Sequence, residues 1–122
     1  MPLILIFHPE FEPEFKTLSG AVHVELAASA KALEARGPMQ GRPLVDTLKG
    51  SKHANMKELR FNADAGVWRA AFAFDPEQNA IVLIAGDKSG VSEARFYRSI
   101  LETADARYDA HLEVVNKRRQ KK

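Results

Sequence analysis

Three short segments in the middle of the chain are predicted strands separated only by short turns, and the first two alternate between two faces. The segments are 57–62, 67–74 and 81–88. A period of two is typical of a β-strand that buries one face. The first connection is Ala63-Asp64-Ala65-Gly66 and the second begins with Asp75-Pro76, and these residue types favour turns. The pattern predicts an antiparallel β-meander, which is the strongest restriction on the fold.

Helical periodicity flanks the meander on both sides. Before it, apolar residues from Phe11 to Leu33 recur at the spacing of one helix face, and Gly20 predicts a break within this stretch. After it, Ser92 is the expected N-cap of a long helix. The remaining predictions are a buried strand over 3–7, helices over 9–18, 20–36 and 92–116, and a long loop over 38–55 with at most one short turn at 45–48.

The predicted order is β-α-α-β-β-β-α. This is an α+β fold in which a small, largely antiparallel sheet packs against an N-terminal helical pair and a C-terminal helix. With 122 residues, of which 45% are hydrophobic, the chain is large enough for one domain with a modest core. We expect that single domain to span 1–122, with a basic, frayed tail over 117–122.

Composition restricts the cellular setting. No apolar run approaches the roughly 18 residues of a membrane span, and the stretch 3–7 lacks the preceding basic residues of a signal peptide. The absence of cysteine excludes disulfides and thiolate chemistry. We therefore expect a cytoplasmic protein with no membrane contact.

The hairpin between the first two predicted strands determines which side chains share a face. Pairing the two aromatic core candidates, Phe61 and Trp68, leaves a four-residue loop in which Gly66 supplies a permissive backbone. The same register puts Arg60 directly opposite Arg69. Like charges in that position destabilise a sheet, so the pair indicates a function rather than a contribution to folding.

The next hairpin adds a third cation. The apolar faces of its strands align in the pairs Phe74–Ile81 and Phe72–Leu83. In that register Lys88 joins the face of the two arginines, and Gly86 leaves an opening beside them. The alternative is that Glu58 or Asp87 neutralises the cluster, although an exposed ion pair contributes only about 0–1 kcal/mol and is compatible with a binding function.

Two arginines and a lysine on one face are suited to a phosphate. Arginine binds phosphate in a bidentate manner and stays protonated, while lysine supplies a point charge or a proton. RNA carries its own nucleophile, the 2′-hydroxyl, so a protein can cleave it by positioning and charge stabilisation. The four histidines are scattered and form no metal-ligand pattern. We expect neither a metal nor a cofactor.

Other residues near these segments are weaker candidates. The predicted RNA-binding residues are Lys52, His53, Lys57 and Ser89. For His53 the alternative is a solvated loop histidine. Tyr97 could stack on a base, but its helical spacing favours core packing, and His111 is expected to be structural or exposed. Charge supports a polyanion partner, because residues 1–50 hold 5 Lys/Arg and 6 Asp/Glu (net −1) and residues 51–122 hold 13 and 10 (net +3).

Four segments occur in a recognisable order and spacing: Gly50–His53, Met56–Arg60, Trp68–Phe72 and Gly86–Gly90. Together they resemble the RelE/ParE toxin superfamily, and most of all its phage-derived Gp49-like, HigB-type branch. The expected order of elements is similar to the fold of that superfamily. The resemblance covers about residues 3–112.

The resemblance implies a toxin of a type II toxin–antitoxin system that cleaves mRNA, usually on the ribosome. It also implies a cognate antitoxin with a helix-turn-helix, through which the complex would bind operator DNA. Catalytic roles map onto Arg60, Arg69 and Lys88. Many relatives have two lysines at the last strand, where this chain has Asp87-Lys88, so the proton-transferring residue is not assigned. Two alternatives remain: a ParE-like poison of DNA gyrase, and a degenerate toxin that only binds its antitoxin as a co-repressor.

Overall fold

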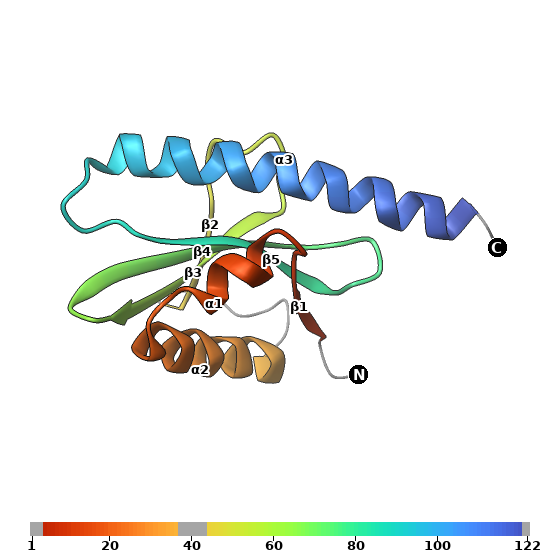
Figure 1. The fold of residues 1–122 in the computed structure, drawn as a ribbon. Helices are drawn as coiled ribbons and strands as arrows, with labels where there is room; N and C mark the ends of the chain where they lie inside the picture. Colours follow the sequence, from red (N-terminus) through yellow and green to blue (C-terminus); the bar gives the residue numbers. More distant parts are fainter. Residues whose placement is uncertain (1–3, 37–43, 121–122) are drawn as a thin grey trace.

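A five-stranded sheet forms the centre of the protein, with the strand order β1-β5-β4-β3-β2 (Figure 1). The structure is a computed structural model, and it describes residues 4–36 and 44–120. Its elements are β1 (Leu5–Phe7), α1 (Phe11–Lys16), α2 (Gly20–Arg36), β2 (Val45–Thr47), β3 (Met56–Ala63), β4 (Gly66–Phe74), β5 (Ala80–Asp87) and α3 (Glu93–Gln120). The predicted α+β fold is confirmed.

Helices cover both faces of the sheet, so the protein has two cores. Figure 1 shows α1 and α2 on one side of the sheet and α3 along the other. The residues that alternate along each strand divide between the two faces, as a period of two requires. Leu59, Phe61 and Phe72 pack with α1 and α2, whereas Met56 and Ala73 pack with α3. We call these two faces the α1–α2 face and the α3 face.

The β3–β4 hairpin has the predicted register. Phe61 pairs with Trp68 and Arg60 with Arg69. The turn differs from the prediction, because Ala63 and Gly66 still pair and only the two residues between them form the loop. Both have positive φ, 51° for Asp64 and 58° for Ala65, as the mirror-image turns that suit a twisted hairpin require. Gly66 therefore does not supply the unusual backbone conformation.

The β4–β5 hairpin follows the predicted register at one end only. The pair Arg69–Gly86 is confirmed, but Phe72 pairs with Val82 and not with Leu83. The register shifts between Ala71 and Phe72, because β5 has a β-bulge opposite them in which Leu83 pairs with no residue of β4. An extra residue reverses the facing of everything beyond it. Consequently Ile81 and Leu83 pack on the α3 face, contrary to the prediction, while Lys88 lies on that same face as predicted.

The two edge strands also differ from expectation. Residues 45–47 form β2, which pairs antiparallel with β3, where the sequence predicted a turn. The strand β1 pairs parallel with β5, but it is not fully buried, because Ile6 is 40% exposed. The predicted end of α2 at Gly37-Pro38 lies outside the described residues.

The helix α3 begins as predicted and ends later. The Ser92 hydroxyl accepts the Arg95 N–H at 3.2 Å, which is the geometry of an N-cap. The helix continues to Gln120, and Arg118 forms an ion pair with Glu77 at 3.2 Å. The expected frayed tail is therefore helical over 117–120, while 121–122 lie outside the described part. Among residues 4–36 and 44–120, no helix combines the length and apolarity needed to cross a membrane.

Candidate functional site

The two opposed arginines on the α3 face share one carboxylate. Glu58 Oε1 lies 3.6 Å from the Nε of Arg60 and 3.6 Å from the Nε of Arg69. Glu58 precedes Arg60 by two residues in β3, so both side chains point to the same face. The repulsion that the sequence pattern implied is therefore offset by a carboxylate between the two cations, as one of the sequence-based alternatives proposed.

Burial separates the roles that the two arginines can have. Arg69 and Glu58 are each only 6% exposed, whereas the Arg60 side chain is 34% exposed. Glu58 Oε2 and Arg69 Nε are buried and have no hydrogen-bond partner within the described structure. Buried charged atoms without hydrogen bonds are costly, so this arrangement is not optimised for stability. Arg60 is the arginine that a ligand can reach directly.

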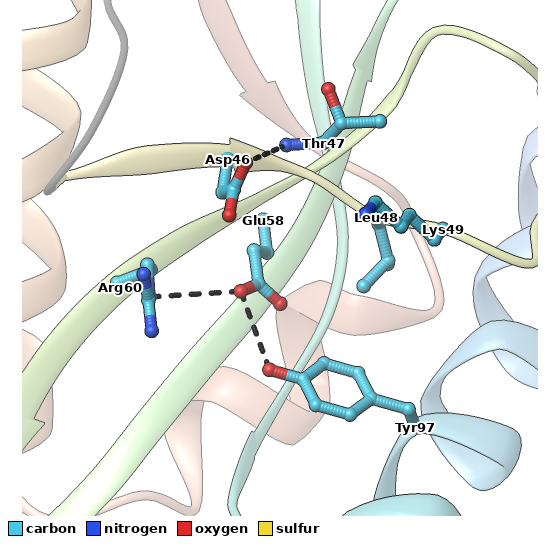
Figure 2. A pocket seen from close by; sticks show the side chains of 7 residues that line it. All are labelled: Asp46, Thr47, Leu48, Lys49, Glu58, Arg60 and Tyr97. Carbon is cyan, nitrogen blue, oxygen red and sulfur yellow. Dashed lines mark hydrogen bonds and ion pairs between the residues drawn. The ribbon is translucent and has the colours of Figure 1, made fainter.

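Tyr97 of α3 completes this group. Its hydroxyl donates to Glu58 Oε1 at 3.3 Å (Figure 2), and burial raises the pKa of the phenol. The predicted core role is only half correct, because the ring packs partly against the α3-face core while the hydroxyl reaches the arginine cluster. The helical spacing of the apolar residues placed Tyr97 on the buried face of the helix. It could not show that the hydroxyl at the end of the side chain needs a polar partner.

Lys88 lies at the end of the same face and has its own carboxylate partner. Its Nζ is 2.8 Å from Glu93 Oε1 and 5.8 Å from the centroid of the Tyr97 ring. The hydrogen bond from Lys88 lowers the pKa of Glu93. Because the Glu93 side chain is 71% exposed, this ion pair is weak and open to exchange with another anion.

The opening expected beside Gly86 is filled. A Cβ on Gly86 would lie 3.2 Å from Phe96 Cε1, so the glycine makes room for α3 and not for a ligand. Asp87 does not neutralise the cations either. Its Oδ1 accepts the N–H of Val67 at 3.1 Å and of Ser89 at 2.9 Å, and the Ser89 hydroxyl, which also donates to it, lowers the Asp87 pKa.

Of the four predicted RNA-binding residues, three lie apart from the cluster. Lys52 forms an ion pair with Asp109 of α3, and His53 Nε2 forms a hydrogen bond with the same carboxylate at 2.8 Å. They fasten the loop before β3 to the helix. Lys57 pairs with Phe72 and so belongs to the α1–α2 face, opposite to Arg60. Ser89 follows Lys88 directly and is exposed. His111 is structural as expected, since it is buried and bonds Asp75 at 2.8 Å.

A pocket of about 340 Å³ opens beside Arg60 (Figure 2). It is lined by Asp46, Thr47, Leu48, Lys49, Glu58, Arg60 and Tyr97. The residues of β2 and those just after it were not recognised in the sequence, because three strand residues are too few to display a period. Across the described ranges, no group of three or more His, Asp or Glu side chains is placed to hold a metal.

Residues 13–109 match the family model described as phage derived protein Gp49-like (DUF891). The chain belongs to this family. Two Mycobacterium tuberculosis proteins, HigB2 and HigB3, whose names class them as candidate toxins, are 42% and 38% identical to this Gp49-like chain over 100 and 110 residues. The HigB2 alignment covers 78% of the chain and 49% of HigB2, so the chain spans about half of that relative. The HigB3 alignment covers 90% and 94%.

The fold of the Gp49-like chain is that of RelE. The free-state structure of a mutant of the Escherichia coli toxin RelE superimposes with a TM-score of 0.57, at 17% sequence identity. The match covers 83% of this chain and 95% of the RelE chain. At this identity the likeness concerns the fold alone.

Proposed function

We propose that the chain is the toxin of a type II toxin–antitoxin system and that it cleaves mRNA, bound to the ribosome, without a metal ion. The observation that carries this proposal is the pair Arg60–Arg69, directly opposed across β3 and β4 with Glu58 between them, on the face that also holds Lys88. Membership in the Gp49-like family and the names of the two HigB relatives support it. A cognate antitoxin is the partner that such a toxin requires.

The charges divide into a binding part and a supporting part. Arg60, the more exposed arginine, binds the scissile phosphate, and Lys88 binds it from the end of β5 by exchanging its exposed partner Glu93. Arg69 lies below and holds Glu58 in position. Two cations at the phosphate stabilise the charge that develops as the nucleophile attacks, and such electrostatic stabilisation is a main source of rate acceleration in many enzymes.

Proton transfer uses the buried carboxylate. Glu58, which lines the pocket beside Arg60, accepts the proton of the RNA 2′-hydroxyl, while Tyr97 holds its Oε1. The 2′-oxygen forms a bond to phosphorus, and the bond from phosphorus to the 5′-oxygen breaks. Lys88 gives its proton to that leaving oxygen. The products are a 2′,3′-cyclic phosphate and a 5′-hydroxyl.

Induced expression tests the proposal. Wild type should stop growth and produce mRNA ends that primer extension can map. Glu58→Gln keeps the shape of the side chain but removes the proton acceptor, so we expect cleavage to fall about 100-fold or more, within the usual range of general-base contributions. Arg60→Ala should reduce cleavage to a similar extent. Glu25→Gln, on the exposed surface of α2, is the matched control and should leave cleavage unchanged. Full toxicity of both site variants would contradict the mechanism.

A second candidate function is favoured by one observation. Each of the three cations has a carboxylate partner, and Arg69 is nearly buried, as in a toxin that has lost catalysis and acts only as an antitoxin-binding co-repressor. A wild-type chain that never slows growth but still forms a tight antitoxin complex supports this candidate. Gyrase-linked DNA breaks with intact mRNA would instead indicate a ParE-like poison.

A further inference from the structure

The charged groups of the α3 face lie in a row along β3. The Lys88 N–H donates to the carbonyl of Val67 at 2.8 Å, and Val67 pairs with Asn62. Lys88 is therefore level with a point two residues beyond Arg60 in β3. Glu58 lies two residues before Arg60 on the same face. Along the strand the order is thus Lys88, Arg60 and Glu58, so both of these cations lie on one side of the carboxylate.

A further cation, Lys49, extends this row beyond Glu58. The ladder between β2 and β3 continues to Leu48, whose N–H donates to the carbonyl of Met56 at 2.9 Å. Lys49 is the next residue, so it lies about three residues past Glu58, roughly 10 Å along the sheet at the rise of a β-strand. Lys49 lines the same pocket as Glu58 and Arg60 (Figure 2). This pocket therefore has cations on both sides of the Glu58 carboxylate.

The Lys49 side chain is available to an anion. It is exposed, and no residue in the described part of the chain forms an ion pair with it. Arg60, Arg69 and Lys88 differ in this respect, because each has a carboxylate partner. Asp46 lines the pocket as well, but it already has interaction partners. An anion can therefore bind Lys49 without displacing a carboxylate from it.

Contacts with α3 fix the backbone that carries Lys49. Gly50 follows with a φ of 96°, and a Cβ on it would lie 3.2 Å from Leu101 Cδ1, so the chain passes close to the helix. The Ser51 hydroxyl then donates to Asp105 Oδ1 at 2.5 Å. A side chain that starts from a fixed backbone loses less freedom when it binds a ligand, which favours binding.

The proposed reaction gives this row a direction. The 2′-hydroxyl that Glu58 deprotonates belongs to the nucleotide on the 5′ side of the scissile phosphate. The oxygen that Lys88 protonates belongs to the nucleotide on the 3′ side. Glu58 lies towards Lys49, and Lys88 lies at the other end of the row. The RNA must therefore run in the 5′ to 3′ direction from Lys49 to Lys88, with the scissile phosphate at Arg60.

We propose that Lys49 binds the 5′-phosphate of the nucleotide whose 2′-hydroxyl attacks. Arg60 and Lys49 then hold two successive phosphates of one strand, and the neutral ribose between these phosphates lies against Glu58. The alternation of cation, carboxylate and cation matches the alternation of phosphate, sugar and phosphate in RNA. This inference rests on the proposed function and adds a phosphate subsite and a chain direction to it.

Binding of uncleavable dinucleotides tests this subsite. The probe lacks the first 2′-hydroxyl and carries an added phosphate at its 5′ end, at its 3′ end or at neither. In wild type the 5′-phosphate should raise the affinity about fivefold, the upper end for an exposed ion pair, and the 3′-phosphate should raise it less. Lys49→Gln should abolish the gain from the 5′-phosphate. Lys31→Gln, on the exposed surface of α2, removes the same charge from the opposite side of the sheet and should keep the gain.

Equal gains from the two phosphates in wild type, or an unchanged 5′-phosphate gain in Lys49→Gln, would overturn the proposal. Cleavage of ordinary RNA is measured separately. If wild type cuts RNA but the dinucleotide affinities do not depend on Lys49, the subsite is wrong and the endoribonuclease stands. If wild type cuts no RNA on or off the ribosome, the proposed function is wrong, and the dinucleotide affinities alone decide whether Lys49 binds a 5′-phosphate.

Discussion

At the scale of single residues, Gly66 is required because a carboxylate occupies the place of its missing side chain. A Cβ there would lie 2.5 Å from Asp87 Oδ2. That carboxylate cannot move freely, since its other oxygen accepts the N–H groups of Val67 and Ser89. The glycine thus permits the bonds that join the end of β5 to the start of β4, directly before Lys88.

Gly66→Ala should lower the free energy of unfolding by about 1–3 kcal/mol, the usual cost of overpacking. Urea denaturation measures this value. In the background Asp87→Ala the obstructing carboxylate is gone, so the same substitution should cost much less. Equal losses in both backgrounds would show that the glycine is needed for another reason.

The residues of the site differ in how far sequence predicts them. Arg60 and Arg69 could be placed opposite each other because a short turn and a period of two fix the register. Asp46 and Tyr97 could not be placed in the site from the sequence. Asp46 lies in a strand of only three residues, and Tyr97 lies among apolar helix residues whose spacing also fits a core position. The accessibility of Arg69 could not be predicted either, because it depends on α3 covering the sheet.

At the scale of elements, the junction between β1 and α1 contains a buried histidine. His8 is 5% exposed, and its Nδ1 accepts the N–H of Glu10 at 3.1 Å. Burial lowers the His8 pKa below its ordinary value of 6.5, although Glu10 opposes the shift and Arg107 and His111 reinforce it. The folded protein therefore favours the neutral ring.

The stability of the fold should depend on pH through His8. Because the folded state has the lower pKa, the unfolded state binds more protons between the two values. This contribution is complete above pH 6.5 and is lost as the pH falls towards the folded pKa. His8→Asn keeps an acceptor but does not titrate, so urea midpoints measured from pH 8 to 5 should fall less in this variant. A parallel decline in both proteins would assign the effect to other groups.

Elements were predicted where the pattern was long. The helices over 20–36 and from Ser92 onwards and the strand over 57–62 repeat their period, and turn residues mark the ends of the strands over 67–74 and 81–88. The strand β2 is too short to do so, and the bulge escaped detection because Ala70–Phe74 is apolar throughout, which allows either alignment with β5. Only the backbone geometry of the hairpin distinguishes the two registers.

At the scale of the whole molecule, Arg107 joins three layers. From α3 it donates to the carbonyl of Leu83 at 2.8 Å, the residue that the bulge leaves out of the ladder, and it also bonds the carboxylate of Glu14 in α1. The guanidinium lowers the pKa of Glu14. One side chain therefore satisfies an unpaired backbone group and ties the helices of opposite faces together at the edge of the sheet.

Arg107→Gln should destabilise the whole fold by about 1–3 kcal/mol, because the bonds of a charged donor are lost and the Leu83 carbonyl is left without its partner. Calorimetry should still show a single transition, at a lower temperature. Glu14→Gln should cost less, since the Glu14 carboxylate is 46% exposed and the Arg107–Leu83 bond survives. Similar losses in both variants would place the main contribution in the ion pair.

The bulge at Leu83 also makes the site sensitive to the number of residues in β5. Lys88 shares a face with Arg60 because the bulge absorbs one residue of β5; an unbulged strand of the same length would turn the lysine into the α1–α2 layer. Loss of that one extra residue would straighten the strand and leave the pairs on both sides of it unchanged, so the lysine would keep its direction. Loss of a second residue would turn it away. In relatives of this chain, β5 should therefore tolerate the loss of one residue near Leu83 but not of two.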